Sequence, residues 1–173
     1  MEQGLIQIYT GSGKGKSTAA FGLALRAAGA GLRVAVIQFM KPEDSNEARG
    51  LAHLPGVAVY CYGSGRFQRR GVAPQPEELA LAAAAIAKAH ELAADPTLDL
   101  LVLDELCNAV FFGLVEEAAV LDFLTQKPAT LEVVLTGRNA TPALIERADL
   151  VTEMQEIKHP YRQGVPARRG VDF

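Results

Sequence analysis

A glycine-rich turn that directly follows an apolar run constrains the fold more than any other feature of this chain. Residues 5–18 read LIQIYTGSGKGKST, which predicts a strand, a tight loop and the first turn of a helix. Gly11, Gly13 and Gly15 allow the loop backbone to turn its N–H groups inward, and the helix that begins near Lys16 adds its positive end. The stretch therefore predicts a cradle for a polyphosphate.

The side chains of this loop are those that a phosphate and a divalent cation require. Lys16 can reach phosphate oxygens as a point charge, and the Ser17 hydroxyl is placed to bind a Mg²⁺ ion that bridges two of them. Lys14 adds a second cation. The pattern Gly-x-x-x-x-Gly-Lys-[Ser/Thr] is met except at Thr10, where it asks for glycine, so a glycine-rich turn without a ligand is the alternative interpretation.

The composition excludes several classes of protein. The 173 residues are 49% hydrophobic and 21% charged, which predicts one folded domain over residues 1–173. A net charge of −3 differs from the basic character of a nucleic-acid-binding protein, so we expect no nucleic acid partner. Cys61 and Cys107 lack the spacing of a zinc site, and no stretch approaches about 18 consecutive apolar residues. We therefore expect a cytoplasmic protein with reduced thiols and no membrane contact.

Strand-like and helix-like segments alternate along the rest of the chain. The predicted strands after the first are residues 33–39, 57–62, 99–104, 131–136 and 150–156. The predicted helices are residues 18–30, 77–94, 115–125 and 142–148, and residues 40–54 are predicted as a loop with one helical turn. This alternation predicts an α/β fold with a mostly parallel sheet flanked by helices.

Charged residues follow two of the predicted strands directly. Asp104 ends one strand and Glu105 comes next, so both carboxylates lie at the carboxyl end of the sheet, where open α/β sheets bind ligands. Beside a phosphate loop, such a pair positions Mg²⁺ opposite Ser17; a solvated acidic pair is the alternative. Arg138 follows the strand 131–136 on the same side, where it contacts a phosphate or ribose, or only pairs with a carboxylate.

Two irregular segments complete the chain. Residues 63–76 form a long glycine-rich loop in which three arginines surround Phe67, a combination suited to a large anionic or amide-rich ligand. A solvated lid is the alternative interpretation of this loop. Residues 157–173 lack periodicity and follow a strand of the same sheet. Because they contain Pro160 and Tyr161, we expect this C-terminal tail to lie over the ligand side.

Five parts of the chain carry a resemblance to one known family. They are YTGSGKGKSTAA at residues 9–20, VIQFMK at 36–41, LDEL at 103–106, LTGR at 135–138, and ADLVTEM at 148–154 leading into IKHP at 157–160. The chain resembles the P-loop ATP:corrinoid adenosyltransferases, also called cob(I)yrinic acid a,c-diamide adenosyltransferases, which carry threonine at the position of Thr10. The resemblance implies a single-domain P-loop NTPase fold with a RecA-like, mostly parallel sheet.

The resemblance also implies a reaction. Family members transfer the 5′-deoxyadenosyl group of ATP to the Co(I) of a reduced corrinoid and release triphosphate, in the synthesis or salvage of adenosylcobalamin. Because Co(I) is itself the nucleophile, the protein has only to orient ATP and stabilise the leaving charge. By resemblance, Lys14 and Lys16 stabilise the triphosphate. Ser17, Asp104 and Glu105 would hold Mg²⁺ or Mn²⁺.

The remaining binding residues and partners come from the same resemblance. The implied ATP- and corrinoid-binding residues are Gly11, Ser12, Gly13, Lys14, Gly15, Lys16, Ser17, Thr18, Phe67 and Arg138. Family members often carry a Gly-Phe-Thr-Trp segment whose aromatic rings displace a cobalt ligand; residues 65–68 read GRFQ here, and Phe67 is the candidate for that role. The implied partners are an electron donor such as a flavodoxin or flavin reductase, and a second copy of the chain in a homodimer.

Two other classes of function remain open from the sequence. A P-loop kinase or ATPase would use Glu105 to activate water or an acceptor hydroxyl, and would release ADP or phosphate instead of triphosphate. A nucleotide-binding switch without turnover is the second alternative. The sequence lacks the Asn-Lys-x-Asp motif by which GTPases recognise their base, which argues against the commonest kind of switch.

Overall fold

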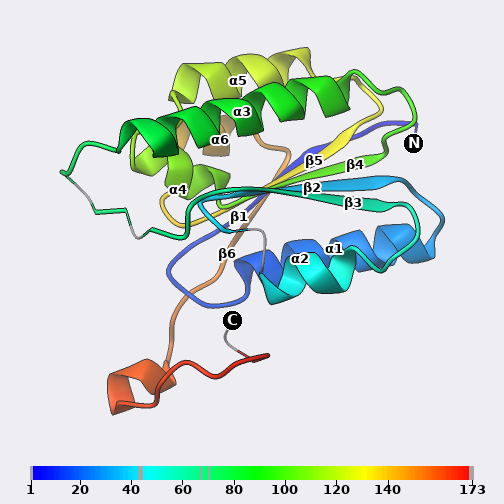
Figure 1. Cartoon of the computed structure of the whole chain (residues 1–173). Coiled ribbons are helices and arrows are strands. Elements are labelled where there is room, and N and C mark those ends of the chain that lie inside the picture. The colour runs from blue at the N-terminus through cyan, green and yellow to red at the C-terminus, as the bar shows by residue number, and fades with distance from the viewer. Residues whose placement is uncertain (1, 43–44, 67, 70, 172–173) are drawn as a thin grey trace.

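A six-stranded sheet flanked by helices forms the centre of the computed structural model, which describes residues 2–42, 45–66, 68–69 and 71–171 (Figure 1). The strands are β1 (Ile6–Thr10), β2 (Val34–Phe39), β3 (Val57–Tyr62), β4 (Leu100–Asp104), β5 (Glu132–Thr136) and β6 (Leu150–Glu153). The helices are α1 (Lys16–Gly29), α2 (Asn46–Leu51), α3 (Pro76–Ala93), α4 (Leu106–Phe111), α5 (Glu117–Gln126), α6 (Pro142–Arg147) and the short 3₁₀ helix η1 (Pro160–Gln163).

The strand order places β1 between β5 and the edge strand β6. The order is β3-β2-β4-β5-β1-β6, and every neighbouring pair runs parallel. The carboxyl ends of all these strands therefore meet at one edge, which is where the sequence places its candidate ligand residues. The predicted α/β fold with a parallel sheet is confirmed.

Helices cover both faces of the sheet, so the strands have two apolar faces. Helices α1 and α2 lie on one face, and α3, α4, α5 and α6 lie on the other (Figure 1). Along β2, Val34 and Val36 join the cluster beneath α1, whereas Ile37 and Phe39 join the cluster beneath α3. This alternation follows from the two-residue period of a strand, and it explains why β2 reads as a nearly continuous apolar run.

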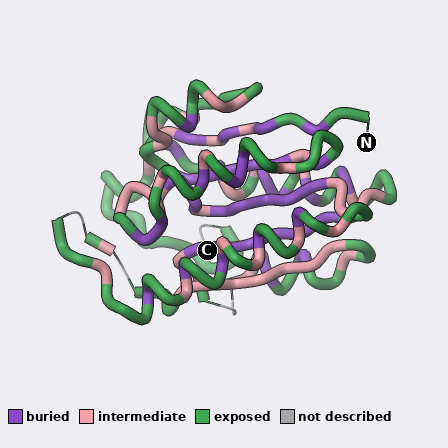
Figure 2. Tube along the Cα trace, turned by 90° about the horizontal axis from the view of Figure 1, so that it is seen from above, coloured by how far each residue is buried: buried purple, intermediate pink, exposed green. Residues whose placement is uncertain are grey.

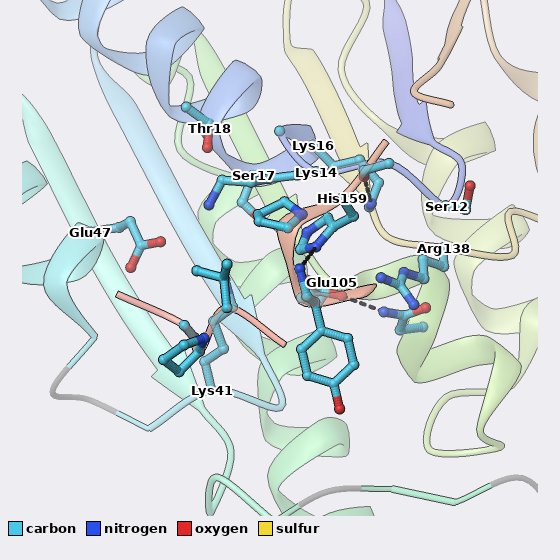
Figure 3. Close-up of a pocket in the computed structure, with 18 residues that line it drawn as sticks. Ser12, Lys14, Lys16, Ser17, Thr18, Lys41, Glu47, Glu105, Arg138 and His159 are labelled. Carbon is cyan, nitrogen blue, oxygen red and sulfur yellow. Dashed lines mark hydrogen bonds between the residues drawn. The ribbon is translucent and has the colours of Figure 1, made fainter. Parts of the chain in front are cut away.

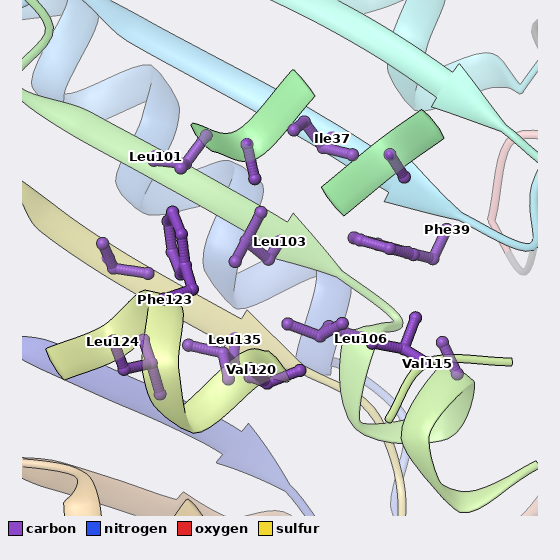
Figure 4. Close-up of a cluster of buried hydrophobic side chains, with 14 of the residues drawn as sticks. Ile37, Phe39, Leu101, Leu103, Leu106, Val115, Val120, Phe123, Leu124 and Leu135 are labelled. Atoms are coloured by element: carbon purple, nitrogen blue, oxygen red, sulfur yellow. The ribbon is translucent and has the colours of Figure 1, made fainter. Parts of the chain in front are cut away.

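The larger of the two clusters lies beneath α3, α4 and α5. Figure 4 shows Leu103 of β4 and Leu135 of β5 in this cluster with Leu106 of α4 and Phe123 of α5. Figure 2 shows the same division over the whole chain, with buried residues along the inner strands and exposed residues on the outer turns of the helices. This core therefore fixes the positions of β1, β2, β4 and β5, and the candidate site lies at the carboxyl ends of these strands.

Small side chains bring α3 close to the sheet. Its buried residues Ala82, Ala85, Ala89 and Ala93 recur every three to four positions and so form one face of the helix. Pro76 lies in the first turn, where a missing N–H is tolerated, and two glutamates follow it near the positive end of the helix. The helix predicted over residues 77–94 is confirmed.

The structure differs from the sequence predictions at two places near the sheet edge. The short helix α4 was not predicted, because its six residues LCNAVF form an apolar run too short to show a helical period. Strand β6 ends at Glu153 instead of residue 156, because the Met154 backbone bonds to the glycine-rich loop. Among the described residues, no helix is both long and apolar enough to span a membrane.

Candidate active site

The carboxyl end of the sheet carries a pocket of about 430 Å³ (Figure 3). The loop after β1 supplies one wall with residues 12–18, and the C-terminal segment supplies another with residues between His159 and Ala167. The remaining lining residues are Lys41, Glu47, Glu105, Asn108 and Arg138. The pocket thus joins segments from both ends of the chain.

The glycine-rich loop is shaped by the segment that follows β6. Met154 N donates to Thr10 O at 2.8 Å, and Gly13 N donates to Met154 O at 2.7 Å. A Cβ atom at Gly13 would lie 2.8 Å from the Met154 carbonyl oxygen, so only glycine fits there without displacement. At Gly15 the backbone has a φ of 114°, a conformation that glycine adopts without strain. These residues are glycines because the loop must both turn sharply and pack against the segment that follows β6.

Lys16 curls back over the loop that precedes it. Its side chain is buried, and Nζ donates to the Gly13 carbonyl oxygen at 2.6 Å. Burial lowers the pKa of Lys16, the positive charge of Arg138 lowers it further, and the carboxylates of Glu105 and Asp104 partly oppose this. Because burial and Arg138 both disfavour the positive charge of Lys16, an anion that enters the pocket would stabilise that charge.

The pocket as a whole favours an anion. Its lining includes four cationic side chains and two carboxylates; the cations are Lys14, Lys16, Lys41 and Arg138. A lining of this composition suits an anion that carries several charges, such as a polyphosphate.

Asp104 lies behind the pocket and is held by three donors. Thr136 Oγ1 donates to its Oδ1 at 2.7 Å, while Lys41 Nζ at 3.0 Å and Gln38 Nε2 at 3.2 Å both donate to Oδ2. The Asp104 side chain is fully buried. Burial alone would lower the pKa of Lys41, but the charge of Asp104 and its hydrogen bond outweigh this and raise it. The two side chains therefore form an ion pair between Lys41, which lines the pocket, and the buried Asp104.

Glu105 is one of the two carboxylates that line the pocket, and Glu47 is the other. Its backbone has a φ of 65°, and its N–H donates to Thr136 Oγ1 at 2.9 Å. The Asn108 side-chain amide donates to its carboxylate. Burial raises the pKa of Glu105, and the neighbouring charge of Asp104 raises it further, against the opposing effects of Lys41 and Asn108. A cation beside this carboxylate would relieve both effects.

Unusual backbone conformations gather at this edge of the sheet. Within the described part of the chain, the non-glycine residues with positive φ are Met40, Glu105 and Asn139. They follow the carboxyl ends of β2, β4 and β5, and each is, or directly adjoins, a residue that lines the pocket. Such conformations cost energy and persist where the surrounding structure holds them, which is common at functional sites.

The structure brings most of the predicted site residues together. Ser12, Gly13, Lys14, Gly15, Lys16, Ser17, Thr18, Glu105 and Arg138 line the pocket. Gly11 packs against Met154, and Asp104 lies behind the pocket floor, so neither is among the lining residues. Phe67 lies outside the described residues.

Several lining residues were not predicted as site residues. Lys41, Glu47, Asn108 and His159 belong to this group. A signal was present for two of them, because Lys41 ends the motif at residues 36–41 and His159 lies in the motif at 157–160. Glu47 and Asn108 lie on short helices and carry no such signal.

The parallel sheet and the glycine-rich loop between β1 and α1 define a P-loop NTPase fold. The genome packaging NTPase of Sulfolobus turreted icosahedral virus 2, solved in complex with AMP, has a similar fold, with a TM-score of 0.51 at 14% identity. The match covers 93% of this chain and 79% of that one. The profile of the family described as ATP:corrinoid adenosyltransferase BtuR/CobO/CobP matches residues 2–173.

Curated relatives agree with this profile. A corrinoid adenosyltransferase of Pseudomonas aeruginosa is 40% identical over 174 residues, which span 99% of this chain and 85% of the relative. A corrinoid adenosyltransferase of a Sinorhizobium species is 42% identical over 175 residues, which span 99% of this chain and 81% of the relative. The chain belongs to the corrinoid adenosyltransferase family and is therefore an enzyme, a transferase.

Proposed function

We propose that the pocket binds ATP and transfers its 5′-deoxyadenosyl group to the Co(I) of a reduced corrinoid, releasing triphosphate. The corrinoid would be cobalamin, cobinamide or cobyrinic acid a,c-diamide. The observation that carries the proposal is the cationic pocket built on residues 12–18, with the buried Lys16 at its centre. Membership of the family favours this reaction over the kinase, ATPase and switch hypotheses, and nothing in the pocket specifically favours one of those.

The bonds that change define what the protein has to do. The electron pair of Co(I) forms the bond to C5′ of ATP, and the C5′–O bond breaks with its electron pair remaining on the triphosphate. Cobalt is formally oxidised from Co(I) to Co(III), and the leaving triphosphate gains one negative charge. We propose that Lys14 and Lys16 stabilise this charge together with the N–H groups of the loop.

The donor set of the pocket suits Mg²⁺ or Mn²⁺ bound together with a polyphosphate. The Ser17 hydroxyl and the Glu105 carboxylate both line the pocket, and both are the hard oxygen donors that these ions prefer. Within the described part of the chain, no group of three or more His, Cys, Asp or Glu side chains is placed to hold a metal. The ion would therefore take its other ligands from phosphate and water, and it would supply positive charge to the phosphate oxygens.

We propose that Asp104 supports the metal site without lining the pocket. Both of its carboxylate oxygens already accept hydrogen bonds, and Lys41 balances its charge. Its part would be to accept from metal-bound water or to hold Glu105 in place. Arg138 lines the same pocket, where it would contact a phosphate or the ribose.

The remaining components stay predictions. Phe67 is the candidate for contact with the corrinoid ring. A flavodoxin or flavin reductase would supply the electron that produces Co(I), and a homodimer is expected from the resemblance. A cytoplasmic location is expected from the cysteine content and hydropathy of the sequence.

An anaerobic assay tests the proposed reaction. Chemically reduced cobalamin is mixed with ATP, Mg²⁺ and the protein, and the Co(I) absorbance, the light sensitivity of the product and the released phosphate species are followed. We expect Co(I) to disappear, a photolabile alkylcobalamin to form and intact triphosphate to be released in equal amount. Release of ADP or inorganic phosphate without an alkylcobalamin would contradict the proposal.

A further inference from the structure

The proposed reaction makes no use of the pocket wall formed by the C-terminal segment. Figure 1 shows this orange-to-red segment leaving β6, forming η1 and turning back. Two contacts with the glycine-rich loop bracket it: Gly13 N donates to Met154 O at 2.7 Å, and Lys14 Nζ donates to Val171 O at 2.7 Å. The segment is therefore attached to the loop at both of its ends, with the pocket between them.

His159 is positioned by the start of η1. Pro160 has no N–H, so the first backbone donor of the helix is Tyr161, whose N–H donates to His159 Nδ1 at 3.2 Å. A neutral imidazole has one donor and one acceptor nitrogen. Because Nδ1 accepts a hydrogen bond, the proton is on Nε2. The sequence His-Pro-Tyr thus fixes the tautomer of His159 and leaves Nε2–H as a donor.

The surroundings of His159 define what this donor can bind. His159 lines the same pocket as Lys16, Ser17 and Arg138, and Figure 3 draws its ring between the glycine-rich loop and Glu105. The same pocket carries the cationic side chains of Lys14, Lys16, Lys41 and Arg138, which favour phosphate oxygens. A fixed N–H donor in such a place matches the same kind of ligand.

We propose that His159 is a further phosphate-binding residue, whose Nε2–H donates to an oxygen of the nucleotide triphosphate and of the triphosphate product. The proposal rests on the proposed function, since it assumes that the pocket holds a polyphosphate. It assigns His159 a binding role and no role as a base, because its acceptor nitrogen is already used by Tyr161.

Two substitutions separate the two nitrogens of the ring. In His159→Asn the side-chain oxygen can still accept from Tyr161 N–H, but no donor reaches the position of Nε2. In His159→Gln the longer amide can place its NH₂ near that position. His53→Asn serves as a matched control, because His53 is exposed and does not line the pocket.

Binding of inorganic triphosphate, measured by isothermal titration calorimetry with Mg²⁺ present, tests the proposal. Loss of a hydrogen bond to a charged group predicts that His159→Asn binds about tenfold or more weakly, with His159→Gln recovering much of the affinity and His53→Asn unchanged. Adenosine, used as a second probe, should bind equally to wild type and His159→Asn.

Several results would overturn the proposal. It is wrong if His159→Asn binds triphosphate as tightly as wild type, if adenosine affinity falls instead, or if both His159 variants lose binding together with their thermal stability. It also falls if the wild-type protein binds no triphosphate. In contrast, triphosphate binding that depends on His159 in a protein that forms no alkylcobalamin supports this inference and contradicts only the proposed reaction.

Discussion

Thr136 Oγ1 donates a hydrogen bond of 2.7 Å to Asp104 Oδ1 and thereby ties the carboxyl end of β5 to that of β4. The same oxygen accepts the backbone N–H of Glu105 at 2.9 Å. One buried hydroxyl therefore fixes the direction of one acidic side chain and the backbone of the next. Glu105 reaches the pocket because this pair holds its backbone at a φ of 65°.

Removal of this hydroxyl should disturb both stability and metal binding. In Thr136→Val, a buried carboxylate loses a donor and a backbone N–H loses its acceptor, which predicts a loss of about 1–3 kcal/mol in the free energy of unfolding. Thr136→Ser keeps the hydroxyl and should lose much less. Urea denaturation measures the first effect, and the Mg²⁺ concentration needed for half-maximal transfer measures the second. Equal Mg²⁺ requirements in wild type and both variants would contradict the positioning role.

Lys16 is expected to be essential for transfer. Loss of a donor that stabilises a developing charge typically costs about a hundredfold or more in rate, so Lys16→Ala should reduce adenosyl transfer by at least that factor. Its thermal unfolding should stay close to wild type, because the buried ammonium is not favoured by its surroundings. Lys88→Ala is the control, since Lys88 lies on α3 and pairs with the exposed Glu91. Activity of Lys16→Ala near that of Lys88→Ala would refute the assignment.

Two glycines on neighbouring elements should respond to alanine in opposite ways. In Gly13→Ala the new methyl group meets the Met154 carbonyl oxygen, so the loop must shift and ATP affinity should fall. In Gly22→Ala, inside α1, nothing lies within 4 Å of the new atom, so stability should rise by about 0.5–1 kcal/mol. Calorimetric ATP titration and thermal unfolding measure the two effects. Undiminished ATP affinity in Gly13→Ala would show that the contact with Met154 does not shape the loop.

The ionised side chain of Glu105 should lower the free energy of unfolding at neutral pH. Burial, and then the charge of Asp104, raise the pKa of Glu105 in the folded state. The contribution of Glu105 to the free energy of unfolding is therefore greatest below its unfolded-state pKa, and it is lost as the pH rises through its folded-state pKa. Glu105→Gln should therefore be more stable than wild type at pH 7, with a difference that shrinks toward about pH 4. Its transfer activity should fall at the same time.

The control for this prediction is Glu146→Gln, on the exposed surface of α6. It should show neither a gain of stability at pH 7 nor a loss of activity. Thermal unfolding of the three proteins between pH 4 and pH 8 measures the effect. A difference between Glu105→Gln and wild type that grows toward low pH would have the wrong sign.

The sheet could be predicted from the sequence because its strands are covered on both faces. Residues 34–37 of β2 and 100–103 of β4 are apolar without interruption, a pattern typical of strands that are covered on both faces. The glycine-rich loop could be predicted equally well, because a steric or electrostatic reason explains the residue type at each of its positions. The likeness of the chain to its family over these segments gave the reaction class.

The separation of Asp104 from Glu105 could not be predicted in the same way. Adjacent residues in a strand point to opposite faces, but here the chain leaves the strand between them through a left-handed turn. That turn depends on Thr136, which is distant in sequence and joins β4 only in the folded sheet. The ion pair of Asp104 with Lys41 also joins residues that are distant in sequence, so no local sequence pattern predicts it.

The positive φ angles of Met40, Glu105 and Asn139 matter for any redesign of this sequence. A procedure that scores each position only by local backbone preference would put glycine at all three, and the resulting chain would lose strain at the ends of β2, β4 and β5. At position 105 it would also remove one of the two carboxylates that line the pocket. Thermostable variants of this enzyme should therefore be sought at sites such as Gly22, away from the edge of the sheet where the natural chain trades stability for geometry.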